Sequence, residues 1–125
     1  MILFMIACLL MNLQARKLAS ITVSAGTGIR IAYISDLHFD RILIQPSYLI
    51  KQICIKCPEV IVITGDLCTD LKYFERVSNF LDMLSYKVGC PILITLGNHD
   101  NIIFEKEKCT KEEYIAALEA IAPNI

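Results

Sequence analysis

Three short apolar runs, each followed at once by polar residues, most constrain how this chain of 125 residues folds. IRIAYIS predicts a strand at about residues 30–35, EVIVIT predicts one at 59–64 and PILITL predicts one at 91–96. Strands that are apolar almost throughout are typical of a parallel sheet whose faces are covered by other layers. The sequence therefore predicts the α/β class, with a mostly parallel sheet and flanking helices.

A helix is predicted after each of the three strands. The segment at about 46–56 begins with a proline, which suits the first turn of a helix. Apolar residues recur at intervals of three and four over about 70–89 and mark one face of a second helix. Thr110 and Glu113 have the spacing of a capping box, so a last helix is expected at about 110–122. Right-handed crossovers would then bring the carboxyl ends of all three strands to one edge of the sheet.

Polar clusters follow each predicted strand at this edge, where open α/β sheets bind their ligands. They are Asp36-x-His38, Gly65-Asp66 and a Gly-Asn-His-Asp at 97–100, and they contain both histidines of the chain. Each cluster alone is an ordinary turn sequence. Their order, at steps of about thirty residues that each fit one βα unit, favours a single shared site.

The side chains of these clusters are suited to binding metal ions. Asp36 and His38 are two residues apart, so in extended backbone their side chains would point to the same side and could bind one cation. Asp66 has two carboxylate oxygens, enough to bridge a pair of cations. Carboxylate and imidazole together favour manganese, iron or zinc, and a two-metal site is a common means of polarising a phosphoryl oxygen.

The last cluster offers a ligand and two catalytic groups. Asn98 supplies a neutral carbonyl oxygen that ligates without adding charge. His99 is expected to protonate a leaving alkoxide. Asp100 is expected to orient the imidazole of His99 and raise its basicity.

Three stretches of the chain resemble the motifs of a known family. "YISDLHFD", "VIVITGDLCTD" and "ILITLGNHD" are similar to the first three motifs of the calcineurin-like metallophosphoesterases, and they cover residues 30–100. The helix predicted to about 122 matches what usually follows in that family. The Ser-Asp-Leu-His motif, which follows an apolar N-terminus, is most similar to that of bacterial-type, sometimes membrane-tethered, phosphohydrolases.

The resemblance implies a fold, a reaction and a set of ligands. The fold would be the N-terminal half of a four-layer α/β/β/α sandwich, and the substrates would be phosphomonoesters, phosphodiesters or pyrophosphates. Asp36 and His38 would bind the first divalent metal ion, and Asp66 would bridge both ions. Asn98 would bind the second ion, and His99 would assist the leaving group.

The chain departs from that family at its C-terminal side. Complete members carry a further lone histidine and then a Gly-His-x-His, and this sequence ends before either and has no third histidine. The second metal would keep only the bridging carboxylate and the amide. One face of the sheet would also be bare, as a large apolar patch, because the second sheet is missing.

We therefore interpret residues 21–125 as a truncated metallophosphoesterase domain, from a shortened reading frame or completed by another chain, and expect it to be inactive alone. The alternatives are a non-catalytic remnant or interaction protein that keeps the half-fold, and a membrane-tethered accessory protein.

Residues 1–15 form an apolar segment that ends at Arg16 and Lys17. It is shorter than the roughly 20 residues that span a bilayer, and it lacks the basic start and cleavage site of a secretory signal. Two interpretations stay open: a membrane tether, or an apolar first element that packs on the domain. The expected localisation is accordingly cytoplasmic or membrane-associated.

Charge and cysteine spacing argue against several other functions. The net charge is −1 and no basic block is present, which argues against a nucleic-acid-binding surface. The six cysteines are scattered through apolar segments, as expected for reduced thiols rather than a disulfide framework. Cys54 and Cys57 form a lone C-x-x-C, for which a place on a helix's core face is favoured over a zinc or redox site.

Overall fold

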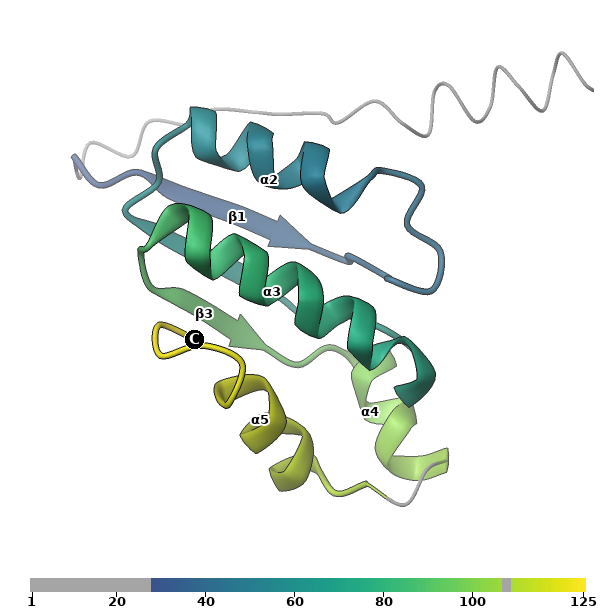
Figure 1. Cartoon of the computed structure of the whole chain (residues 1–125). Helices are drawn as coiled ribbons and strands as arrows, with labels where there is room; N and C mark the ends of the chain where they lie inside the picture. Colours follow the sequence, from purple (N-terminus) through teal and green to yellow (C-terminus); the bar gives the residue numbers. More distant parts are fainter. Residues whose placement is uncertain (1–27, 107–108) are drawn as a thin grey trace, which may run out of the picture.

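The apolar runs form the predicted parallel sheet in a computed structural model, which describes residues 28–106 and 109–125. The strands β1 (Ile31–Ser35), β2 (Val60–Thr64) and β3 (Ile92–Thr95) lie in the order β1-β2-β3, with both neighbouring pairs parallel (Figure 1). The α/β class and the parallel sheet with flanking helices are thus confirmed. The strand ends that carry the three polar clusters lie at one edge.

Helices α2 and α3 connect successive strands and lie on the same face of the sheet (Figure 1). The helical elements are α2 (Pro46–Ile55), the short 3₁₀ helix η1 (Leu71–Tyr73), α3 (Phe74–Val88), α4 (Asn98–Lys106) and α5 (Lys111–Glu119). Gly89 ends α3 in left-handed backbone, with φ 63°, and the predicted capping box of Thr110 and Glu113 starts α5.

Helix α4 was not predicted from the sequence. Its first residues, Asn-His-Asp, read as a turn, and its apolar residues Ile102, Ile103 and Phe104 are consecutive rather than spaced at three and four. Packing against other parts of the fold stabilises this helix, although its sequence lacks the periodicity of an amphipathic helix. Ile103 is fully buried, and the rings of Phe104 and Phe74 both pack against Tyr114 of α5, with centroids 5.6 and 5.3 Å away.

The hydrophobic core lies between the sheet and the helices α2 and α3. Alternate residues of the central strand, Ile61 and Ile63, are fully buried, as the two-residue period of a strand requires. They face the apolar stripe of α3, whose buried residues include Val77, Leu81 and Leu84. Burial of this stripe holds the crossover helix on the sheet and so fixes where the strand ends lie.

The opposite face of the sheet carries exposed apolar side chains, as predicted. Ile31, Tyr33 and Leu93 are 59%, 68% and 57% exposed. Tyr33 also accepts a hydrogen bond from Thr64 Oγ1 across the strands at 2.8 Å. Within the described residues this face is therefore an apolar surface with a few polar groups.

The apolar segment at residues 1–15 lies outside the described residues. Among the residues that are described, no helix has the length and apolar character needed to cross a bilayer.

Candidate metal centre

The turns that follow β1 and β2 adopt left-handed backbone at the predicted site residues. Asp36, His38 and Asp66 have φ of 54°, 43° and 55°. Such values are uncommon for residues other than glycine, and they cluster where a fold holds side chains for function. The expectation that Asp36 and His38 share one face of extended backbone was wrong, because β1 ends at Ser35 and the turn begins there.

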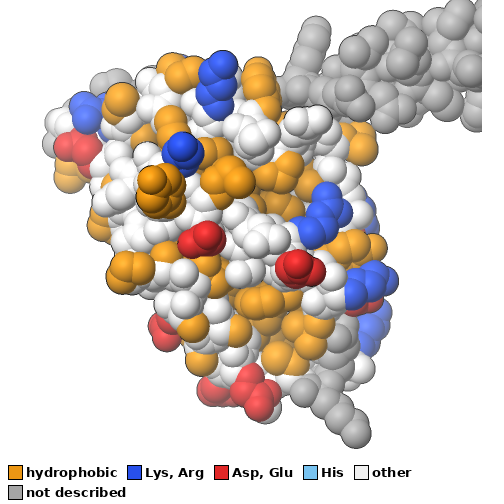
Figure 2. Space-filling view, in the orientation of Figure 1, with side chains coloured by type: hydrophobic (Ala, Val, Ile, Leu, Met, Phe, Trp, Pro, Cys, Tyr) orange, Lys and Arg blue, Asp and Glu red, His pale blue; other side chains and the backbone are white. Residues whose placement is uncertain are grey.

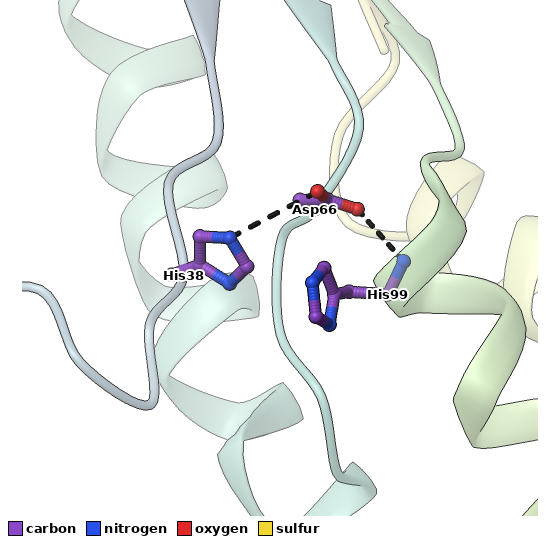
Figure 3. A group of neighbouring side chains, drawn as sticks. All are labelled: His38, Asp66 and His99. Carbon is purple, nitrogen blue, oxygen red and sulfur yellow. Dashed lines mark hydrogen bonds and ion pairs between the residues drawn. The ribbon is translucent and has the colours of Figure 1, made fainter.

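Three predicted side chains converge at the carboxyl edge of the sheet. The ligand atoms of His38, Asp66 and His99 lie within 4.8 Å of one another (Figure 3). His38 Nε2 is 3.9 Å from Asp66 Oδ2, and the backbone N–H of His99 donates to Asp66 Oδ1 at 2.8 Å. The two imidazole rings meet edge to face, with centroids 4.9 Å apart. Two neighbouring imidazoles thus lie close to one carboxylate, whose orientation is fixed by a backbone hydrogen bond.

Two glycines allow the turns after β2 and β3 to approach closely. A Cβ added to Gly65 would lie 2.5 Å from Gly97 Cα, and one added to Gly97 would overlap the carboxylate of Asp66. Side chains at these positions would push the two turns apart. The glycines in "GD" and "GNHD" are therefore needed for the carboxylate of Asp66 to reach His99.

Asp100 joins the same two turns through the backbone. Its side chain is completely buried and accepts backbone hydrogen bonds, three of them at 2.7–3.0 Å and one at 3.5 Å. The donors are the N–H groups of Asp66, Leu67, Cys68 and Gly97. Burial raises the pKa of the Asp100 carboxyl group, while these hydrogen bonds oppose the rise.

This arrangement corrects the expectation that Asp100 orients the imidazole of His99. Both of its oxygens are directed at backbone N–H groups, and His99 Nδ1 is buried without a hydrogen-bond partner. Asp100 acts on the site by fixing the two turns that carry Asp66 and His99.

The remaining predicted ligands lie at the rim of this cluster. Asp36 is exposed and does not belong to the group formed by His38, Asp66 and His99. Asn98 is also exposed, as the first residue of α4 and the neighbour of His99. Their roles as ligands stay predictions.

Asp40, which was not predicted from the sequence, places a nearly buried side chain beside the cluster. Its side chain is 7% exposed, and its Oδ1 lies 3.8 Å from His38 Nδ1. The only signal in the sequence is a carboxylate two residues after the histidine of "DLHFD". No spacing rule predicts that this side chain turns back towards the imidazole.

A cavity of about 550 Å³ lies next to the cluster, and His99 forms part of its wall. Its other lining residues include Asp40, Arg41, Asp70, Lys72 and Lys106. Three cationic and two anionic side chains therefore line a space that reaches the cluster.

The cluster has the composition of a site for a divalent metal ion. Imidazole nitrogen and carboxylate oxygen suit manganese, iron and zinc. The described residues thus fit a metal ion held by His38 and Asp66, with the ring of His99 beside it.

Comparison with known proteins supports this interpretation. The sequence model of the family described as calcineurin-like phosphoesterase matches residues 29–123, which include all three strands and all the polar clusters. None of the curated proteins matches the chain.

Proposed function

Because this chain belongs to the calcineurin-like phosphoesterase family, we propose that its site takes part in metal-dependent hydrolysis of phosphoric esters. The observation that carries the proposal is the convergence of His38, Asp66 and His99 at the carboxyl edge of the sheet. A bound divalent metal supplies Lewis acidity towards a phosphoryl oxygen and a hydroxide nucleophile at neutral pH.

The side chains around Asp66 are the proposed ligands. His38 would bind through Nε2, which faces Asp66 Oδ2. The other oxygen of Asp66 is held by the His99 N–H, so the carboxylate cannot rotate freely away from the ion. Asp36 and Asn98 are proposed as further ligands on the family resemblance, for two ions in the complete site, with manganese, iron or zinc as candidates.

His99 is the proposed proton donor. Its ring lies beside Asp66 and forms part of the cavity wall, where a leaving group would be released. An imidazolium N–H there would give its proton to the departing alkoxide and return to the neutral state. Asp100 would contribute by holding the turn that carries His99, as the four backbone hydrogen bonds indicate.

The charge of the cavity supports an anionic substrate. Arg41, Lys72 and Lys106 line it, and Asp40 and Asp70 pair with the first two, so the lining keeps an excess of one positive charge. Lys and Arg side chains also gather on the side of the molecule towards which the strands point (Figure 2). Phosphate esters and pyrophosphates carry the negative charge that such a cavity favours.

We expect the chain of 125 residues to hydrolyse a bis-aryl phosphate only weakly in the presence of Mn²⁺. Its two histidines and the predicted Asp36, Asp66 and Asn98 cannot fill two metal shells, and an incomplete shell binds weakly. Release of the aryl alcohol, with and without added Mn²⁺, measures this. The matched control is the His99→Ala variant.

Each outcome of that assay has a distinct meaning. Weak turnover that requires Mn²⁺ and disappears in His99→Ala supports the proposed function. Rapid turnover that His99→Ala abolishes would also support the proposed function, but it would contradict our expectation that the metal shells are incomplete. Metal binding with no turnover at all would favour a non-catalytic protein.

The non-catalytic alternative has an observation of its own. The exposed apolar face that includes Ile31, Tyr33 and Leu93 is the kind of surface through which proteins associate. An interaction protein or a membrane-tethered accessory protein would bind a partner through this face. The metal cluster would then only stabilise the fold.

A further inference from the structure

Asp40 and His38 present two buried polar atoms to each other. Asp40 Oδ2 accepts a hydrogen bond from Arg41 Nε at 2.8 Å. Asp40 Oδ1 and His38 Nδ1 are both buried, and neither has a hydrogen-bond partner. The two atoms lie 3.8 Å apart.

This separation is slightly too long for a hydrogen bond, whose N···O distance is about 2.7–3.2 Å. A buried polar atom without a hydrogen-bond partner lowers the stability of the fold. Here each of the two atoms could serve as the partner of the other. A small rotation of the ring or of the carboxylate, which shifts one of the two atoms by less than about 1 Å, would form a hydrogen bond between them.

The backbone of the turn keeps the two side chains together. The N–H of Arg41 donates to the His38 carbonyl at 2.7 Å, which closes a tight turn around Asp40. The N–H groups of His38 and Phe39 donate to the carbonyls of Asp66 and Leu67, both at 2.8 Å. The turn is therefore tied to the end of β2, and His38 has little freedom to move away from Asp66 or from Asp40.

We propose that Asp40 is a positioning residue for His38, accepting the hydrogen of Nδ1–H and thereby fixing the ring tautomer and orientation. A neutral imidazole has one donor nitrogen and one acceptor nitrogen. With the hydrogen held on Nδ1 by Asp40, Nε2 keeps its lone pair and faces Asp66 as a ligand. The consequence for metal binding rests on the proposed function.

A carboxylate is the side chain that this place requires. Asp40 accepts from Arg41 on one oxygen and faces His38 with the other. An amide of the same shape offers one acceptor and one NH₂ donor, so Asp40→Asn would set a donor against either the guanidinium or the imidazole.

Cobalt titration of the Asp40→Asn variant tests the consequence for the metal site. We expect the affinity for Co²⁺ to fall about 10–100-fold, with an altered visible absorption spectrum, because the ligand ring is no longer fixed. Asp70→Asn is the matched control: it makes the same change of charge in the wall of the same cavity, but this carboxylate pairs with Lys72 at 2.9 Å. The control is expected to bind Co²⁺ as the parent chain does.

A second measurement needs no variant. The chain has only two histidines, so ¹⁵N labelling of histidine gives two easily separated sets of ring signals. At alkaline pH, His38 in the parent chain is expected to carry its hydrogen on Nδ1. A hydrogen on Nε2 would overturn the proposal, even if Asp40→Asn failed to fold.

The two measurements separate the proposals. Parent-like Co²⁺ binding in a folded Asp40→Asn variant would overturn the role of Asp40 and leave the metal site intact. A parent chain that bound no Co²⁺ would contradict the proposed function, and the tautomer of His38 would then decide the role of Asp40 by itself.

Discussion

In the Asp100→Ala variant, the free energy of unfolding is expected to fall by about 3 kcal/mol or more. The substitution leaves buried N–H groups of Asp66, Leu67 and Gly97 without the acceptor that they now share. Each unsatisfied buried donor costs about 1–3 kcal/mol, and a domain of this kind has only about 5–15 kcal/mol in total. Loss of this one side chain should therefore consume a large part of the stability.

Urea unfolding followed by circular dichroism measures this loss. Asp82→Ala is the control, because Asp82 is exposed on α3 and its removal should change the free energy of unfolding by less than about 0.5 kcal/mol. An Asp100→Ala variant as stable as the Asp82→Ala variant would show that Asp100 does not hold the two turns together.

Asp66→Asn is expected to weaken the binding of Mn²⁺ by roughly 100-fold or more, beyond the 10–100-fold typical of residues that only support a ligand. Asp66 is the carboxylate of the cluster and lies close to both histidines. The amide keeps the size of the side chain and an oxygen that can accept the His99 N–H, but it removes the negative charge. The variant should therefore fold and lose metal affinity.

Isothermal titration with Mn²⁺ compares this variant with the parent chain and with Asp82→Asn, which removes the same charge from the exposed surface of α3. Only Asp66→Asn should lose affinity. Equal binding by all three proteins would place the metal elsewhere.

Most of the fold could be predicted from the sequence because its signals are local. The strands begin and end within a residue or two of the apolar runs, and Gly89 and the capping box of Thr110 and Glu113 mark helix ends through their own backbone chemistry. Helix α4 (Asn98–Lys106) has no such signal, since its stability comes from packing against residues distant in the sequence.

The site could be predicted only in part, for a related reason. The edge of the sheet that gathers His38, Asp66 and His99 follows from the parallel topology. The contacts of Asp40 and Asp100 do not, because they depend on how individual turns bend after the strands end. The left-handed backbone at His38 and Asp66 directs side chains in ways that a strand period cannot predict.

The most direct test of a metal site at this edge is anomalous X-ray diffraction from crystals of the Mn²⁺-loaded chain. We expect a manganese peak within bonding distance of His38 Nε2 and the Asp66 carboxylate. A crystal soaked at the same Mn²⁺ concentration with no peak between these side chains, or with its manganese bound elsewhere on the molecule, would contradict it.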